Sequence, residues 1–360
     1  MRFRVATVIA LGMLVSISTS SAVALPSRLN ILIVGKIELR RGGRGNFQAV
    51  RAPKRLNLND VVRSRRGSNA KILCSGFSPR SIPNTGAYAV KKICPSSGPR
   101  VLPGGSQGDY LPTRGGEDLL IPFVIAPRKT KILSNTPLIQ WNRVPGANEY
   151  TVRLLSPDGE LWEKTVQGTK VRYPGSPALK RDLKYSIEVR ANTGSTSTDE
   201  GIPGLAFILI DEGTAQEIAT DVELLAEQKL PTEAEAFVLA QIYRQHHLLA
   251  EAIALLEAID RESIQSPATY RLLGDLYRQS RLNRHAQKAY IEALSIAKNN
   301  EDLEEKAASL VALGNIHIVL DDIQQAVKYL EEARDLYFLL EGDRFGIVQI
   351  ISDQLSELSS

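Results

Sequence analysis

A pattern of residue sizes repeats through the last third of the chain, and it constrains the fold more than any other feature. The pattern in residues 267 to 300 occurs again 34 residues earlier, from Glu233, and 40 residues later, from Ala307. With Pro267 as position 1, positions 4, 7, 8, 11, 20, 24 and 27 hold Tyr270, Leu273, Gly274, Tyr277, Ala286, Tyr290 and Ala293. The earlier unit holds Ala236, Leu239, Ala240, Tyr243, Ala252, Leu256 and Ile259, and the later one Leu310, Leu313, Gly314, His317, Ala326, Leu330 and Ala333. Self-similarity at this period predicts stacked helical units.

The residue sizes explain how such units would pack. Small residues at positions 8 and 20 let two helices approach closely, and large ones at 4, 7, 11 and 24 fill the layer between successive pairs. This pattern resembles the tetratricopeptide repeat (TPR), which implies an all-α solenoid over 211–360 with repeats near 233–266, 267–300 and 307–340. Segments 215–228 and 345–358 are expected to be cap helices. The six extra residues before the third unit, around Asn299 to Asp302, are expected to lengthen a turn.

Helix starts are also encoded locally. Thr214 with Glu217, and Thr232 with Glu235, have the Thr-x-x-Glu form of a capping box. Ser266 precedes a first-turn proline, Pro267. The sequence therefore predicts helices that begin at these points.

The resemblance also implies a ligand surface. In TPR proteins the first helix of each unit lines a concave groove, with positions 2, 5, 9 and 12 facing the ligand. The polar residues at these slots, which form our candidate partner-binding groove, are Gln241, Arg244, Arg271, Asp275, Arg278 and Asn315. Such residues could hold the carboxylates or backbone of a peptide. They differ from the Lys and Asn set of repeats that clamp a chaperone C-terminus. An ordinary solvated face, with Arg271 paired to Asp275, remains the alternative.

No pattern in the sequence indicates catalysis. Paired carboxylates, a Ser/His/Asp set and a Cys/His pair are not apparent, so we predict neither enzyme activity nor a cofactor. His317 replaces an aromatic residue at position 11, and His246, His247 and His285 do not fall at ligand spacing with it. We therefore predict that no metal is bound and that His317 is a core or edge residue.

The N-terminus has the layout of a secretory signal peptide over residues 1–24. Arg2 and Arg4 precede an apolar run from Val5 to Ile17, and Ala22 and Ala24 precede a candidate cleavage point. An uncleaved anchor is the alternative, but the run is shorter than the roughly 20 residues that cross a bilayer. We expect an exported protein, in the periplasm, cell envelope or medium, with no membrane span after cleavage.

Residues 25–134 predict an all-β domain. Short apolar alternations are separated by turn residues, including Arg-Gly-Gly-Arg-Gly at 41–45, which indicates a hairpin tip better than a nucleic-acid contact. The segments Gly35–Arg40, Leu56–Ser64 and Ala70–Leu73 resemble a FecR-like domain, an exported β module. The resemblance implies a β scaffold. The sensor-regulator role of the namesake is not implied, because no transmembrane helix precedes the segment.

The chain has two cysteines, Cys74 and Cys94. In an oxidising compartment an isolated pair usually forms a disulfide, and closing a loop of about 20 residues would stabilise by roughly 3 kcal/mol. Two free buried thiols remain the alternative.

Residues 135–210 predict a second β module. Trp141, Tyr150, Val152, Leu154 and Trp162 fall on alternating strand positions, and the segment from Leu183 to Ala191 alternates likewise. The segment resembles a fibronectin type III-like β-sandwich, with Trp141 at its core tryptophan and Tyr185 at its conserved strand tyrosine. This implies a spacer or adhesive unit. Aromatic stacking on sugar rings is the alternative.

Charge is divided unevenly along the chain. Residues 25–134 carry 20 Lys and Arg against 5 Asp and Glu, whereas residues 211–360 carry 13 against 27. The two parts could attract one another within or between chains, giving self-association that salt weakens. The basic part could also lie on an anionic envelope polymer, through a patch that comprises Arg63, Arg65, Arg66, Lys91 and Lys92.

These features together predict a multidomain, exported, non-catalytic scaffold that binds a protein or peptide partner through the TPR groove. The alternative is a protein that binds peptidoglycan or another anionic glycan through its basic N-terminal β domain. Nucleic acid is not an expected partner.

Overall fold

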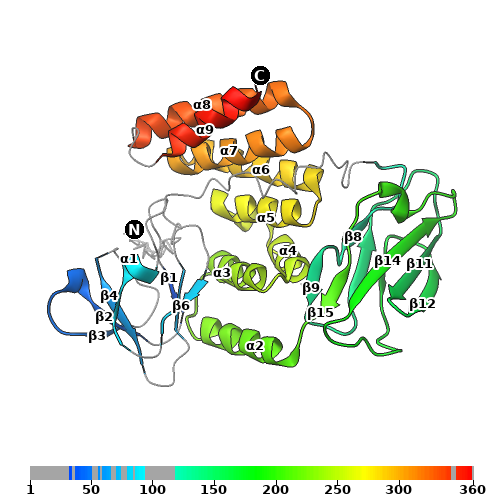
Figure 1. Ribbon diagram of the computed structural model, residues 1–360, viewed down its shortest axis with the longest axis horizontal. Coiled ribbons are helices and arrows are strands. Elements are labelled where there is room, and N and C mark those ends of the chain that lie inside the picture. Colours follow the sequence, from blue (N-terminus) through cyan, green and yellow to red (C-terminus); the bar gives the residue numbers. More distant parts are fainter. Residues whose placement is uncertain are drawn as a thin grey trace, which may run out of the picture.

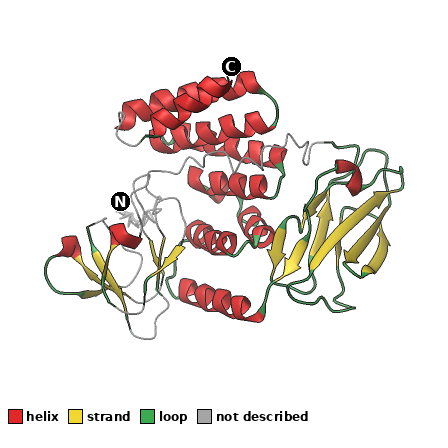
Figure 2. Ribbon diagram, viewed as in Figure 1, coloured by secondary structure: helices red, strands yellow, loops and turns green. Residues whose placement is uncertain are grey.

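A computed structural model of the chain describes residues 32–34, 37–50, 56, 59–65, 70–73, 79–83, 86–93, 118–341 and 346–358. Helices form a stack through the middle of the molecule, and strands lie in two regions beside it (Figures 1 and 2). The signal-like segment 1–24, Arg66, Cys74 and Cys94 lie outside the described residues. The disulfide and signal-peptide predictions therefore remain predictions.

The N-terminal strands form two small sheets. One has the order β1-β5-β6, from Leu32–Val34, Lys71–Leu73 and Pro79–Ser81. The other has the order β3-β2-β4-β7, from Gln48–Val50, Ile37–Arg40, Val61–Ser64 and Tyr88–Ala89, followed by the short helix α1 (Val90–Ile93). Alternate residues such as Ile37, Leu39 and Val62 face a common core. The predicted strands are confirmed here, whereas the FecR-like assignment is not tested.

Two further sheets share a core in the middle of the chain. One has the order β13-β10-β8, from Lys170–Arg172, Leu138–Trp141 and Val124–Ala126. The other has the order β12-β11-β14-β15-β9, from Gly159–Val166, Tyr150–Ser156, Lys184–Ala191, Phe207–Leu209 and Thr130–Ile132. Trp141 and Tyr185 are 1% and 2% exposed, so neither ring is available to stack on a sugar. The Tyr185 hydroxyl accepts a hydrogen bond from the Lys180 amide at 2.7 Å.

The domain boundary that we predicted at residue 134 divides these sheets and has to move. β8 pairs with β10, and β9 runs parallel to β15, so both strands belong with the middle sheets. The physical reason is that hydrogen-bonded strands need not be neighbours in the sequence. A boundary before about residue 123 keeps every pair of β8 and β9 together.

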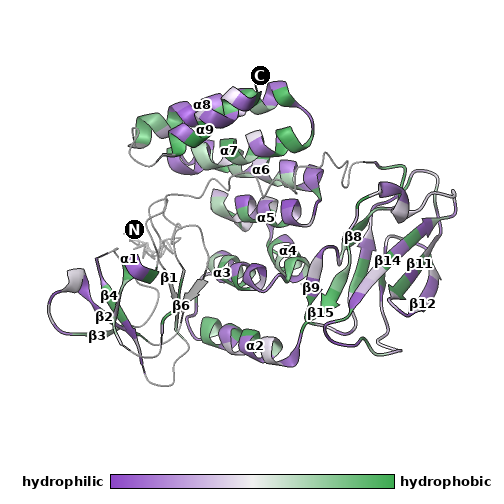
Figure 3. Cartoon of the chain, in the orientation of Figure 1, coloured by the Kyte–Doolittle hydropathy of each residue, from purple (hydrophilic) through white to green (hydrophobic). Residues whose placement is uncertain are grey.

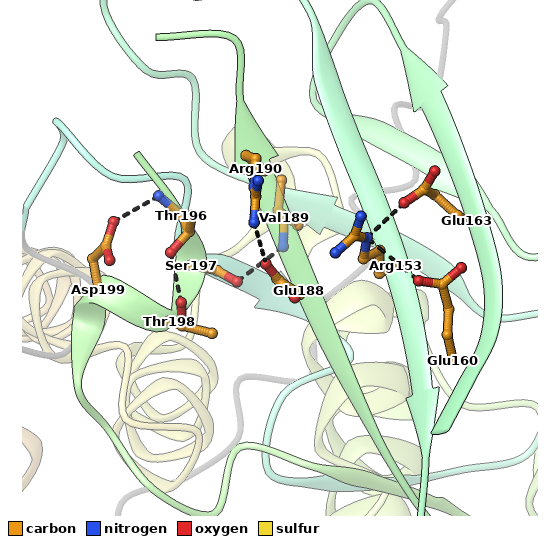
Figure 4. Close-up of polar contacts among 10 residues, drawn as sticks. All are labelled: Arg153, Glu160, Glu163, Glu188, Val189, Arg190, Thr196, Ser197, Thr198 and Asp199. Atoms are coloured by element: carbon orange, nitrogen blue, oxygen red, sulfur yellow. Dashed lines mark hydrogen bonds and ion pairs between the residues drawn. The ribbon is translucent and has the colours of Figure 1, made fainter. Parts of the chain in front are cut away.

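The solvent-facing side of the second sheet carries charged side chains. Arg153 on β11 lies between Glu160 and Glu163 of β12, at 3.4 and 2.5 Å (Figure 4). On β14 Glu188 contacts Arg190 at 3.5 Å, and the Val189 amide donates to Ser197 Oγ at 2.9 Å. The charged groups mark the face that stays in water, whereas the bond from Val189 to Ser197 is buried.

The helices occur in the predicted pairs. α3 (Thr232–Gln245) packs on α4 (Leu249–Glu257), α5 (Pro267–Gln279) on α6 (Asn283–Asn299), and α7 (Leu303–Val319) on α8 (Ile323–Glu341). α2 (Glu212–Ala226) precedes them and α9 (Ile347–Leu358) follows, where cap helices were expected. Among the described residues, none of the helices combines the length and apolarity needed to cross a membrane.

The predicted close approach at position 8 is visible atom by atom. A Cβ added to Gly274 would lie 2.3 Å from Cε1 of Tyr290, and one added to Gly314 would lie 2.6 Å from Cγ of Leu330. The alanines at position 20, Ala286 among them, are fully buried. The residue sizes that defined the repeat are therefore packing requirements.

Several local predictions were wrong. Asp211, and not Thr214, caps α2, because its Oδ1 accepts the Thr214 amide at 2.8 Å. α3 begins at Thr232 after Pro231, without a side-chain cap. The extra residues before the third unit lengthen a helix, because Asp302 caps α7 and α7 begins at Leu303. Adding a helical turn costs less than ordering a longer loop, since each added residue gains a backbone hydrogen bond.

The middle sheets are docked on the helices through the segment 123–133. α4, coloured largely hydrophobic in Figure 3, contacts α3, α5 and β9. Its N-terminus is capped from far away in the sequence, because Thr130 Oγ1 accepts the Leu249 amide at 2.8 Å and the Ala250 amide at 3.3 Å. Phe123 is buried in the helical core. The Thr130 hydroxyl on β9 thus replaces a local N-cap side chain of α4 and attaches the middle sheets to the first repeat.

Candidate protein-interaction surface on the helical stack

The predicted groove residues lie where the repeat pattern places them, on the first helix of successive pairs. Gln241 and Arg244 lie on α3, Arg271, Asp275 and Arg278 on α5, and Asn315 on α7. Apart from the buried Gln241, all are partly exposed. The structure thus brings the six side chains onto one series of adjacent helices.

Most of these side chains bond to the next first helix along the stack. Arg244 contacts Asp275 at 3.5 Å, and Arg271 donates two hydrogen bonds to Glu305, at 3.0 and 3.2 Å. Asn315 Oδ1 accepts from Gln354 Nε2 of α9 at 2.7 Å. We call these contacts the inter-repeat ladder. Their first role is to hold successive units in register, which the sequence did not reveal because the partners lie one unit away.

Electrostatics within the ladder are strongly coupled. Burial works to lower the pKa of Arg271, but the adjacent Glu305 outweighs it and holds the guanidinium charged. Asp275 also accepts the Tyr290 hydroxyl at 2.8 Å, and burial together with this carboxylate raises the pKa of that phenol. The charge of Asp275, four residues along the same helix, also raises the pKa of Arg271, and both residues pair with neighbouring helices. A partner would meet a surface of fixed, mixed charge.

Two of the groove positions on α3, the first helix of the first unit, are buried. Gln241 is 1% exposed and its Oε1 has no hydrogen-bond partner in the part of the chain that the structure describes. Phe237, also a groove position, is fully buried. β6 contacts α3 and β1 contacts α2, on the side where Figure 1 places the N-terminal sheets. The accessible part of the surface therefore begins at Arg244, near the end of α3, and continues on α5.

The predicted basic patch is partly neutralised. Arg63 Nε lies 2.5 Å from Glu38, Arg65 lies 3.5 Å from the same carboxylate, and Arg63 also stacks on the Phe47 ring at 4.3 Å. Lys91 and Lys92 are exposed on α1. The patch therefore divides into two arginines with an acidic partner and two exposed lysines.

His317 is confirmed as a buried edge residue of the helical core. It is 6% exposed, with Nδ1 3.0 Å from Asp322 and Nε2 3.0 Å from Gln287. These contacts tie the end of α7 to the turn before α8 and to α6.

Sequence reasoning missed the residues that join the sheets to the helices. Arg128 is 1% exposed, forms a bidentate ion pair with Glu200 at 2.7 and 2.8 Å, and donates to the Ser280 carbonyl at 2.8 Å. Glu251 accepts the Leu133 amide at 2.8 Å, while burial raises the pKa of its carboxyl to about 7. The available signal was the strand-like alternation in 123–133, which we assigned to the wrong module.

A cavity of about 410 Å³ lies between β14 and the segment 197–206. Ile187, Ile202, Pro203 and Leu205 are among its lining residues. None of the residues of the inter-repeat ladder is among those that line it.

Paired helices with small residues at their contacts, joined by a polar ladder, define an all-α helical-repeat fold over the described C-terminal region. No family model matches the chain, and no curated protein matches it. Among solved structures, the helical region is similar to BtubC (BKLC) from P. vanneervenii, with 22% identity, a TM-score of 0.33, and coverage of 41% of this chain and 66% of that one. It is also similar to a protein described as a kinesin light chain with nearly identical TPR-like repeats, from Podosopora anserina, with 18% identity, a TM-score of 0.30, and coverage of 40% and 87%. Because both TM-scores are low, the assignment of helical repeats rests on the helix pairs of this chain.

Proposed function

We propose that the chain is an exported, non-catalytic scaffold that binds a protein or peptide partner on the first helices of its repeats. The observation that carries the proposal is the inter-repeat ladder, which keeps Arg271 and Asp275 of α5 at fixed positions on a partly exposed face that also carries Arg278. Such rigid, mixed-sign donors and acceptors suit the backbone and carboxylates of a peptide. The signal-like N-terminus supports the exported location.

Simple alanine substitution tests this surface poorly, because Arg271→Ala would also break the bonds to Glu305. Photo-crosslinking leaves the ladder largely in place. The full chain with Arg278→p-benzoylphenylalanine should capture a discrete partner from its native compartment. The matched control is Glu292→p-benzoylphenylalanine, at an exposed position on the second helix α6. Identical products from both positions, or none from either, would contradict the proposal.

A second candidate is binding of an anionic envelope polymer. It is supported by the exposed Lys91 and Lys92 on α1 and by the net positive charge of residues 25–134. Co-sedimentation of the full chain with purified cell wall at low salt should fall on Lys91→Glu plus Lys92→Glu, and should fall for the parent at high salt. Sedimentation that ignores both changes would exclude this mode. In the first case the FecR-like and fibronectin-like β regions would both act as spacers, and in the second only the fibronectin-like region would.

A further inference from the structure

Three side chains with metal-binding atoms converge where α2 meets the end of α3. Glu217 and Asp221 lie one helical turn apart on α2, and His246 is the C-cap residue of α3. One carboxylate oxygen from each acid and one ring nitrogen all lie within 4.8 Å of one another. None of the histidine spacings in the sequence revealed this set, because two of its members are carboxylates on another helix.

The convergence is fixed by apolar packing and not by the polar groups alone. Ile218, next to Glu217, is buried against Leu248, which follows His246 by two residues, in a cluster with Ile210. Because this contact holds α2 against the turn between α3 and α4, the three polar side chains are brought together whenever the cap helix docks. Such placement on rigid elements is what a metal site requires.

The distances are close to those of coordination. Two ligands of a tetrahedral ion with bonds of about 2.0 to 2.1 Å lie about 3.3 Å apart. Because the ligand atoms all lie within 4.8 Å of one another, each pair needs to approach by at most about 1.5 Å. Glu217 is exposed and can supply that movement by side-chain rotation, whereas Asp221 is 1% exposed and held in place. The exposed acid also gives an ion a route of entry from solvent.

The types of ligand atom in this cluster indicate which metal ion would bind. An imidazole nitrogen with two carboxylate oxygens suits Zn²⁺ and similar transition metals, whereas Ca²⁺ and Mg²⁺ prefer all-oxygen sites. The C-terminal end of α3 adds partial negative charge at the same point, which favours a cation. Three protein ligands leave a fourth position for water.

We propose that Glu217, Asp221 and His246 bind a divalent transition-metal ion of the Zn²⁺ class, which fastens the cap helix α2 to the first repeat. The site is separate from the inter-repeat ladder and does not depend on the proposed function. An imidazolium paired with the two carboxylates, without any metal, is the competing arrangement.

The test uses the full chain, stripped with a chelator and titrated with Zn²⁺ by calorimetry, with Co²⁺ absorption as a second readout. We expect one equivalent to bind and the melting temperature to rise. His246→Ala and Glu217→Gln should each weaken binding about tenfold or more, and His247→Asn, at the neighbouring exposed histidine, should leave it unchanged. Asn suits position 247, where φ is +60°.

Each result decides the proposal. Glu217 is exposed, so Glu217→Gln reports on ligation even if His246→Ala fails to fold. Absence of binding to the parent would overturn the metal site and leave the metal-free arrangement of the three side chains. Binding of equal strength in Glu217→Gln and His246→Ala would also overturn it, because the ligands would then lie elsewhere, for example at Cys74 and Cys94.

Discussion

The helical stack and the middle sheets differ in how far along the chain each residue finds its partner. In the stack Asp275 bonds to Tyr290, 15 residues away, and Arg271 bonds to Glu305, 34 residues away on the first helix of the next pair. In the sheets Arg128 pairs with Glu200 across 72 residues, and Thr130 caps a helix 119 residues later. Contacts within the helical stack recur at a regular spacing that can be read from the sequence. The long-range contacts of the sheets do not recur, so no pattern in the sequence predicts them.

The two regions also meet through buried polar groups, which makes their junction the most sensitive point of the molecule. Arg128 and Glu200 side chains are 0% and 2% exposed, and the arginine also reaches the turn between α5 and α6. Breaking a buried pair from one side leaves an uncompensated charge, which costs about 3–5 kcal/mol.

The largest effect is therefore expected from Arg128→Ala. It should lower the free energy of unfolding by about 3–5 kcal/mol and uncouple the two regions. Both tryptophans of the chain, Trp141 and Trp162, lie in the middle sheets, so fluorescence reports the sheets while circular dichroism at 222 nm reports the helices. Denaturation curves from the two probes should coincide for the parent and separate for the variant. Coinciding curves in the variant would mean that Arg128 does not couple the regions.

A pH-dependent effect is expected at the same junction. Burial raises the pKa of Glu251 from 4.5 to about 7, and its Oε2 has no hydrogen-bond partner in the described ranges. The folded state thus holds the proton more strongly than the unfolded state, and stability falls as pH rises from about 4.5 to 7. Above pH 7 the ionised, buried carboxylate costs up to about 3 kcal/mol.

Glu251→Gln removes this cost while keeping an acceptor for the Leu133 amide. The variant should unfold at higher denaturant concentration than the parent at pH 8, and the difference should vanish near pH 4. Glu292→Gln, at an exposed site on α6, is the matched control and should show no such pH dependence. A constant difference between variant and parent at all pH values would contradict the buried-carboxyl interpretation.

Within the stack, the periodic packing is tested at Gly274. Gly274→Ala would force a methyl group to 2.3 Å from the Tyr290 ring and should cost about 1–3 kcal/mol, seen by circular dichroism. Tyr290→Leu in the same chain should recover part of the loss, because the first repeat already combines Ala240 with Leu256 at the equivalent positions. Gly213→Ala, where the nearest atom is 3.3 Å away, is the control with a smaller expected loss. Equal losses at both glycines would remove the packing explanation.

These cases show what the sequence could predict. The helix pairs, the small residues at positions 8 and 20, and the burial of Trp141 and Tyr185 follow from spacing and alternation, because a local period decides which face is buried. The sequence predicted the ladder residues Arg271 and Asn315 but not their partners Glu305 and Gln354. β8, β9 and the buried Arg128 were assigned to the wrong module, because strand pairing across many residues leaves no local trace.

The smallest expected effect is a difference in coupling free energy between two ion pairs, one in the helical stack and one on the middle sheets. Arg271 and Glu305 are 20% and 14% exposed in the ladder, whereas Arg153 and Glu163 are 36% and 40% exposed on the sheet surface. A double-mutant cycle to alanine should give a coupling of about 1–3 kcal/mol for the ladder pair, because charge-assisted bonds are strong when water is largely excluded. The same cycle for Arg153 and Glu163 should give a weak coupling that disappears at high salt, since solvent and ions screen exposed charges. Two outcomes would contradict this explanation by solvent exposure. One is a coupling of Arg153 with Glu163 that persists at high salt, and the other is a coupling of Arg271 with Glu305 that disappears there.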